Sequence, residues 1–255
     1  MLKFFRKIRQ QLVREKKIRN YLIYAIGEII LVVIGILIAL AINNAQQKRV
    51  LAQKEQIYLK GLYSEFETSR EKLQELITVN EQNYEGAKRL LEFTANQDLL
   101  PSEAQFSKLL YQSFNFDIAF NPNNSLLNEM ISSGSLKDIS NTALRIQLTN
   151  WVATLDDITR QEEDLGNQRQ KVLDMFRNDD YSIRTIYEYA NVDQQKRSLI
   201  EANNLSNLNL LRSVAFENNM FMFYLTSLST EASHYDPLMK NLDTILELIE
   251  IELKE

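Results

Sequence analysis

The sequence has no cysteine and only one histidine, His234, among its 255 residues. Without cysteine the chain can form no disulfide bond, thiolate metal site or cysteine nucleophile. A chain of this length needs no disulfide to build a core, so the lack of cysteine does not tell whether the protein lies in a reducing or an oxidising compartment. His234 has no second histidine with which to form a zinc site. It lies at a predicted helix end beside Asp236, and we interpret it as a capping or surface residue.

Glycine and proline are also scarce, with six and three residues respectively. Because these residues mark turns and strand ends, and because Leu, Glu, Gln, Asn and Lys are abundant, the composition favours long helices. We therefore expect an all-α fold. The hydrophobic content of 45% is ample for one packed core in the part of the chain after residue 42.

The motifs of familiar active sites are missing as well. There is no glycine-rich phosphate loop and no Gly-x-Ser-x-Gly elbow. One acidic group suggests a metal or acid–base site at first sight, and its members are Asp156, Asp157, Glu162, Glu163 and Asp164. It contains no histidine and falls off the apolar stripe of its predicted helix, so we expect it to face solvent. We expect no enzyme activity, no cofactor and no metal.

The chain is organised around an apolar run at residues 21–42. A helix of this run covers about 33 Å at about 1.5 Å per residue, which exceeds the roughly 30 Å of a bilayer's hydrocarbon core. A single segment can cross lipid only as a helix, because a lone strand would leave its backbone polar groups unpaired. The run therefore predicts a transmembrane helix.

Charge is distributed unequally on the two sides of this run. The first 20 residues carry eight basic side chains and one acid, Glu15, whereas residues 43–255 carry 21 basic and 32 acidic side chains. The positive-inside rule then places the N-terminus in the cytoplasm and the large acidic part on the outer side of the membrane. We expect three parts: a basic amphipathic arm at 1–20, the span at 21–42, and an extracytoplasmic domain at 43–255. The acidic domain argues against nucleic-acid binding.

A cleaved signal peptide is the alternative to an anchor. Residues 39–41, Ala-Leu-Ala, resemble a small-residue cleavage site after an apolar stretch. Secretory apolar regions measure about 7 to 15 residues, however, and this run is longer and contains an acid. We therefore favour an uncleaved signal-anchor.

Small residues and one glutamate give the predicted span a distinctive face. Gly27, Leu31, Gly35 and Ala39 recur every four residues, and Glu28 lies beside them. Small residues let a second helix approach closely, and a charge at this depth costs about 2.5 to 3.5 kcal/mol unless it is paired or protonated. Two interpretations stay open: a face for self-association or for another membrane protein, or a lone span with a neutral glutamate.

Four segments of the N-terminal part stand out: FFRKIR at 4–9, YAIGEI at 24–29, VVIGILIAL at 32–40 and INN at 42–44. They resemble the opening of an uncharacterised bacterial family of single-pass inner-membrane proteins, and residues 124–148 resemble a second block shared by that family. The resemblance implies a helical protein that is anchored in the bacterial inner membrane, with a periplasmic domain of unknown function. It indicates no particular activity.

Apolar spacing predicts helices at 44–97, 102–114, 125–133, 141–178, 208–235 and 236–254. The first continues from the span and carries near-heptad, coiled-coil-like steps, with Gly61 and Gly86 as the places where it bends. With the last three it predicts an elongated helical bundle of about four helices. Residues 179–206 are the least regular, and we expect a connection with a short helix there.

Capping residues mark several of these boundaries. Ser102 with Gln105 predicts a capping box, and Ser125 is a predicted N-cap. Gly134 predicts a left-handed helix stop, and Ser140 or Asn141 caps the helix that follows. Pro237, directly after Asp236, predicts that a new helix begins at residue 236.

For two groups of apolar residues, the sequence leaves open what they pack against. The helix at 208–235 is apolar on several faces, which is typical either of a central helix buried on most sides or of an exposed patch for a partner. Phe116, Ile118 and Phe120 alternate before Pro122, and we expect them to plug one end of the bundle.

The sequence favours a membrane-anchored structural or interaction module. Its expected partners are the lipid bilayer and, through the span, a second copy or another membrane protein. The alternative is an extracytoplasmic sensor or binding domain for a small molecule, which needs polar groups around a cavity and a separate partner to carry the signal.

Overall fold

The computed structural model describes residues 18–96, 99–177, 179–190 and 205–254. These residues form helices and contain no strand, so the predicted all-α class is confirmed for them. The predicted basic arm at 1–20 lies almost entirely outside the described residues. The chain divides into two compact units, Met1–Ile57 and Tyr58–Glu255, and helix α2 contributes to both.

Helix α2 spans Ile18–Ala95, so the apolar run and the polar region after it form one helix, as predicted. The helix continues through Gly61 and Gly86, where we predicted bends. Both glycines instead allow close packing. A Cβ at Gly61 would overlap the Leu126 side chain, and one at Gly86 would overlap Ser113 Oγ. Another helix lies close to α2 at both positions, so a larger residue there would require the Leu126 or the Ser113 side chain to move.

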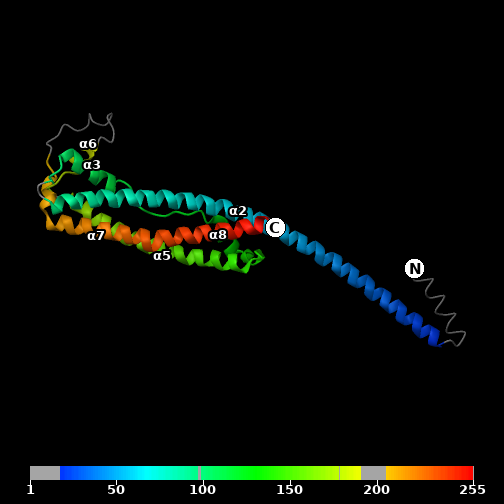
Figure 1. Ribbon diagram of the computed structural model, residues 1–255. Helices are drawn as coiled ribbons and strands as arrows, with labels where there is room; N and C mark the ends of the chain where they lie inside the picture. The colour runs from blue at the N-terminus through cyan, green and yellow to red at the C-terminus, as the bar shows by residue number, and fades with distance from the viewer. Residues whose placement is uncertain (1–17, 97–98, 178, 191–204, 255) are drawn as a thin grey trace. The chain divides into compact units, whose positions relative to one another are not determined.

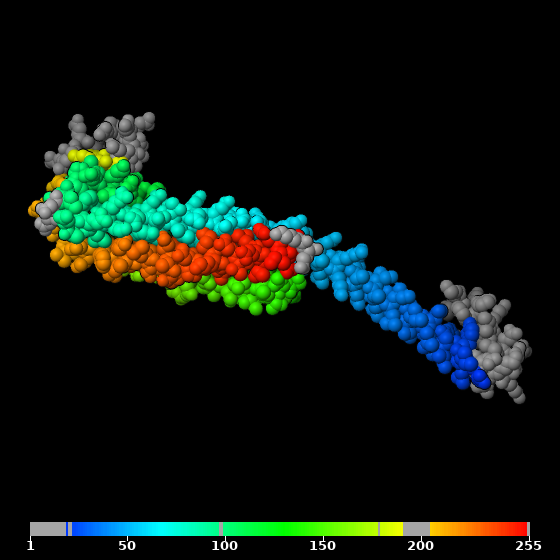
Figure 2. Space-filling model, viewed as in Figure 1, coloured from blue at the N-terminus to red at the C-terminus, as the bar shows by residue number. Residues whose placement is uncertain are grey.

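The second unit contains the remaining helices. They are α3 (Glu103–Phe114), α4 (Ser125–Ser132), η2 (Ser135–Asp138), α5 (Thr142–Asp174), α6 (Ile183–Tyr189), η4 (Leu208–Arg212), α7 (Val214–Thr230), η5 (Glu231–Tyr235) and α8 (Asp236–Lys254). Within this unit α5 packs against α7 and α8, and Figure 1 shows α2 running beside α7 and α8. In Figure 2 the side chains of α2, α7 and α8 form a continuous surface.

Most predicted caps are confirmed. Ser102 and Gln105 form the capping box of α3, Asn141 accepts from Leu144 N–H, and Gly134 has φ of 70°. The predicted cap Ser125 is wrong, because Asn124 precedes α4 and makes no capping bond of its own. A carboxylate from a distant part of the chain takes over that role and is described below.

The chain does not break between residues 235 and 236. Helix α7 continues into α8 through a π-helical turn, η5, which lies between Thr230 and Asp236. Proline removes a backbone donor and its ring collides with the carbonyl four residues earlier. A π turn bonds five residues back and widens the helix, which accommodates Pro237 without ending it.

The core of the second unit consists of fully buried apolar side chains from every long helix. Examples are Leu62 and Phe66 of α2, Trp151 of α5, Phe223 of α7 and Ile245 of α8. Helix α7 also has an exposed apolar face.

The exposed side chains of that face are Phe221, Met222 and Leu225. The second interpretation of this helix, an exposed patch, therefore describes it better than burial on most sides. Whether a partner covers the patch stays a prediction.

Candidate functional site

The apolar part of α2 is exposed on all its faces. Ile29, Leu31, Val32 and Leu37 point in different directions around the helix, and the relative exposure of Leu31 is 66%. Water-exposed apolar surface of this extent is unfavourable by about 25 cal/mol per Å². By length and composition, α2 is the one helix among the described residues that is long and apolar enough to cross a membrane.

The predicted association face lies along this part of α2. Gly27 and Gly35 have open space beside them, since a Cβ on either would meet no atom within 4 Å. Leu31 and Ala39 are exposed, and Glu28 is half-buried and interacts within the chain. The backbone thus leaves room for a second helix at both glycines, and association through this face stays a prediction.

The loop at residues 121–124 and the start of α4 are held against α2 by three side chains on one helical face. Glu65 accepts from the N–H groups of Leu126 (2.7 Å) and Leu127 (3.3 Å) and so caps α4. Ser69 Oγ accepts from the Asn123 N–H at 2.9 Å. A carboxylate at a helix N-terminus satisfies orphan donors and favours the helix dipole.

Lys72 completes this attachment. Its ammonium donates to Asn121 O (3.0 Å) and to Asn123 Oδ1 (2.6 Å). Glu65, Ser69 and Lys72 are separated by four and three residues, so they share one face of α2. This arrangement was not predicted, because the partners are about 50 to 60 residues apart in the chain.

Trp151 joins the loop at residues 121–124 to α5. Its side chain is fully buried, and Nε1 donates to Asn124 Oδ1 at 3.0 Å. Its ring packs at 5.2 Å from that of Phe66 and 6.3 Å from that of Phe120. A buried indole requires such a hydrogen-bond partner, which explains why Asn124 points inward and does not cap α4.

Glu162 does not face solvent, which corrects our prediction for this member of the acidic group. Its Oε1 accepts from the Phe120 N–H (2.9 Å) and from the Tyr235 hydroxyl (2.8 Å). Burial raises the pKa of Glu162, opposed by these two hydrogen bonds, and burial beside Glu162 raises the pKa of Tyr235. The other four members of the group, Asp156, Asp157, Glu163 and Asp164, are exposed as expected.

A second polar network connects α2 to the junction of α7 and η5. Asn80 Nδ2 donates to Ser227 O and to Glu231 Oε2, both at 3.1 Å. The Tyr84 hydroxyl donates to Glu231 Oε1 at 3.3 Å. Burial, with the nearby Glu231 charge, raises the pKa of Tyr84 to about 12, so this phenol stays protonated as a donor.

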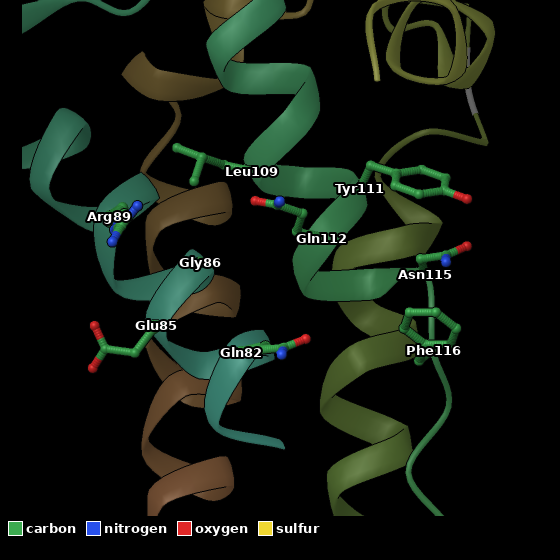
Figure 3. A pocket seen from close by; sticks show the side chains of 9 residues that line it. All are labelled: Gln82, Glu85, Gly86, Arg89, Leu109, Tyr111, Gln112, Asn115 and Phe116. Carbon is green, nitrogen blue, oxygen red and sulfur yellow. The ribbon is translucent and has the colours of Figure 1, made fainter. Parts of the chain in front are cut away.

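A surface groove of about 410 Å³ lies between α2 and α3 (Figure 3). Gly86 forms part of its floor, and Gln82 extends from α2 towards Phe116. Gln112 extends from α3 towards α2. Phe116 is 56% exposed, so it does not plug the bundle's end as predicted, whereas Ile118 is buried. This groove was not predicted, because it forms between segments that only folding brings together.

Two further grooves are found at the surface. One of about 290 Å³ lies between α2 and residues 116–121 and shares Phe116 with the first. The other, of about 480 Å³, lies between α5 and the π turn and contains His234. His234 is half-buried inside a continuous helix, so its predicted position at a helix end is wrong.

The comparison with protein families identifies one match. Residues 28–160 match the family model described as a family of unknown function (DUF6090). The chain belongs to this family. The DUF6090 match begins at Glu28 inside the apolar part of α2 and ends at Arg160 in α5. It therefore includes the loop at residues 121–124, Trp151 and the residues of the first two grooves. No curated protein and no solved structure matches the chain.

Proposed function

We propose that this protein is a single-pass inner-membrane protein whose helical extracytoplasmic domain acts as a structural or interaction module. The observation that carries the proposal is the exposure of every face of the apolar part of α2, while the second unit has a buried core of its own. Lipid is the environment in which such a helix is stable. The basic residues before it orient the N-terminus towards the cytoplasm.

In this proposal α2, α5, α7 and α8 form an elongated helical bundle at residues 43–255. The long-range bonds between these helices support it, including Tyr63 to Glu250 and Asn80 to Ser227. The half-buried carboxylates of Glu65 and Glu162 serve to join helices to neighbouring segments. We assign the protein no enzyme activity, and a scaffold with half-buried structural carboxylates is consistent with that assignment.

Crosslinking in the native membrane tests the module. A short amine-reactive crosslinker applied to intact membranes, followed by affinity purification of the full chain, should recover a discrete crosslinked species. That species is either a second copy or a defined partner protein. A chain that is consistently monomeric and without partners in its own membrane would remove this proposal.

We propose that the chain associates within the membrane through the predicted face of the span. Replacing Glu28→Gln removes a charge, and Gly35→Ile fills the open space beside the helix. Each should lower the signal of a membrane two-hybrid assay. Val33→Ile, on the opposite side of the helix, is the matched control and should leave the signal unchanged. Unchanged signals for both test variants would remove the face.

Ligand sensing is the second candidate, and the groove between α2 and α3 favours it. Its volume of about 410 Å³ and its mixed aromatic and amide lining are suited to a small molecule. A thermal-shift screen on residues 45–255 should then find a compound that raises Tm in a Phe116-dependent way. A screen in which no compound raises Tm would leave the interaction module as the only candidate.

A further inference from the structure

Two of the grooves lie along α2. Lys72, Leu76 and Val79 line the groove beside residues 116–121, and Gln82, Gly86 and Arg89 line the groove between α2 and α3. These α2 positions follow steps of three or four residues, so they lie on one face of the helix. Phe116 lines both grooves and joins them. We call the joined surface the α2 groove.

The opposite wall of the α2 groove is a non-helical segment. Residues 117–124 have no helical structure, and Phe116, Asp117, Ala119, Phe120 and Asn121 line the groove. This wall is held in place, because the Phe120 N–H donates to Glu162 and Lys72 donates to Asn121 O. The lining residues of α2 run from Lys72 to Arg89, so the groove is long enough for an extended chain that lies along the helix.

The polar side chains on the floor match the chemistry of a peptide backbone. Gln82 and Gln112 each carry a donor and an acceptor, and both reach into the space between α2 and α3 (Figure 3). Within the described residues neither side-chain amide makes a hydrogen bond. A primary amide pairs with a peptide group through one N–H and one C=O, independently of the peptide's side chains.

Charge separates the two ends of the α2 groove. At one end Glu75 and Asp117 form no ion pair in the described part of the chain, and they outnumber Lys72, which keeps its positive charge while it donates to Asn121 O and Asn123 Oδ1. At the other end Arg89 also forms no ion pair among those residues.

Glu85, its neighbour at that end, pairs with Lys88 at 3.4 Å. The first end, with Glu75, Asp117 and Lys72, therefore has a net charge of −1, and the other, with Arg89 and the Glu85–Lys88 pair, has a net charge of +1. A partner with the reverse order of charges is favoured.

We propose that the α2 groove binds an extended peptide segment of a partner protein. The segment carries a basic side chain near Glu75 and an acidic one near Arg89, with an apolar side chain against Phe116 between them. Fourteen residues of helix separate Glu75 from Arg89, about 21 Å, which corresponds to about six extended residues at about 3.3 Å each. The inference rests on the proposed interaction module and names the chemistry of its partner.

Selection from a peptide library tests this inference. A phage-displayed random dodecapeptide library is panned against the full chain in detergent micelles, and enriched peptides are synthesised with a fluorescent label. We expect enriched sequences to carry a basic and an acidic residue about six positions apart, with an apolar residue between them. Fluorescence anisotropy then gives Kd for each variant.

Variants on the groove surface decide the outcome. Phe116→Ser and the double variant Gln82→Ala/Gln112→Ala should each raise Kd about tenfold or more, which is about 1.4 kcal/mol of binding free energy. The Arg89→Glu variant should bind the selected peptide more weakly. It should bind more tightly a peptide in which lysine replaces the acidic residue. Met222→Ser, an exposed apolar side chain on α7, is the control and should leave Kd unchanged. All five residues are at the surface, and circular dichroism verifies that the variants fold.

Three results would overturn the inference. They are the failure of any peptide to be enriched, enriched peptides that bind the groove variants as tightly as the original chain, and Phe116-dependent dimers of the chain without peptide binding. These results leave the proposed interaction module untouched, because a different experiment tests it. A chain that crosslinks to a partner in its membrane but binds no peptide keeps the module and loses this inference.

Discussion

At the scale of single residues, Glu162 joins three parts of the fold through one carboxylate oxygen. It lies on α5, accepts from Phe120 in the non-helical segment, and accepts from Tyr235 in the π turn. Because burial raises its pKa, the folded chain holds a proton on Glu162 more readily than the unfolded chain does. Its contribution to stability is therefore largest below its ordinary pKa of 4.5 and is lost as the pH rises through the folded value.

Replacing Glu162 tests this sign. Glu162→Gln keeps an acceptor oxygen for Phe120 and Tyr235 but removes the charge. As the pH rises from 4.5 to about 7, the original chain should lose stability relative to this variant. Glu162→Ala leaves both donors unpaired and should lose about 1 to 3 kcal/mol. Urea titrations at several pH values measure both effects. The exposed neighbour Glu163→Gln is the control. A stability difference between the Glu162→Gln variant and the original chain that stays constant with pH would contradict the account.

At the scale of elements, Gly61 and Gly86 act in α2 as contact points and not as hinges. Gly86 lies directly against α3, where Ser113 Oγ donates to Leu109 O at 2.9 Å. Gly166 in α5, by contrast, has no atom within 4 Å of where a Cβ would be. The two glycines therefore have opposite expected responses to the same substitution.

Alanine at each glycine separates packing from helix propensity. Gly166→Ala should stabilise the chain by about 0.5 to 1 kcal/mol, because alanine favours a helix over glycine. Gly86→Ala should destabilise it by about 1 to 3 kcal/mol, because the new methyl group overlaps Ser113. The double variant Gly86→Ala/Ser113→Ala should recover part of that loss. Thermal unfolding measures all three variants, and equal stabilisation by both single substitutions would refute the close contact.

Local signals in the sequence predicted local structure well. The capping box at Ser102, the left-handed Gly134 and the Asn141 cap depend on residues within three positions of each other, so they could be recognised in advance. The roles of Glu65 and Glu162 depend on partners 61 and 42 residues away. The α2 groove could not be predicted for the same reason, since its two walls are distant in the chain.

At the scale of the whole molecule, the second unit has the contents of an independent domain. Its core includes fully buried side chains from α2 to α8, and its helices are joined by long-range bonds such as Arg70 to Asp243 at 2.9 Å. The apolar part of α2 contributes no buried residue to that core. Removing it should therefore cost the core nothing.

Residues 45–255 should fold in water without detergent. We expect a helical far-ultraviolet circular dichroism spectrum and a single cooperative unfolding transition, because the core remains complete. Aggregated protein, or helical protein without a cooperative transition, would show that the apolar part of α2 is needed for folding.

The central claim is that the apolar part of α2 anchors this chain in a membrane. Alkaline carbonate extraction of membranes from cells that express the full chain, compared with cells that express residues 45–255, tests it most directly. We predict that the full chain stays in the membrane pellet and that residues 45–255 remain in the soluble fraction. Release of the full chain by carbonate would contradict the account.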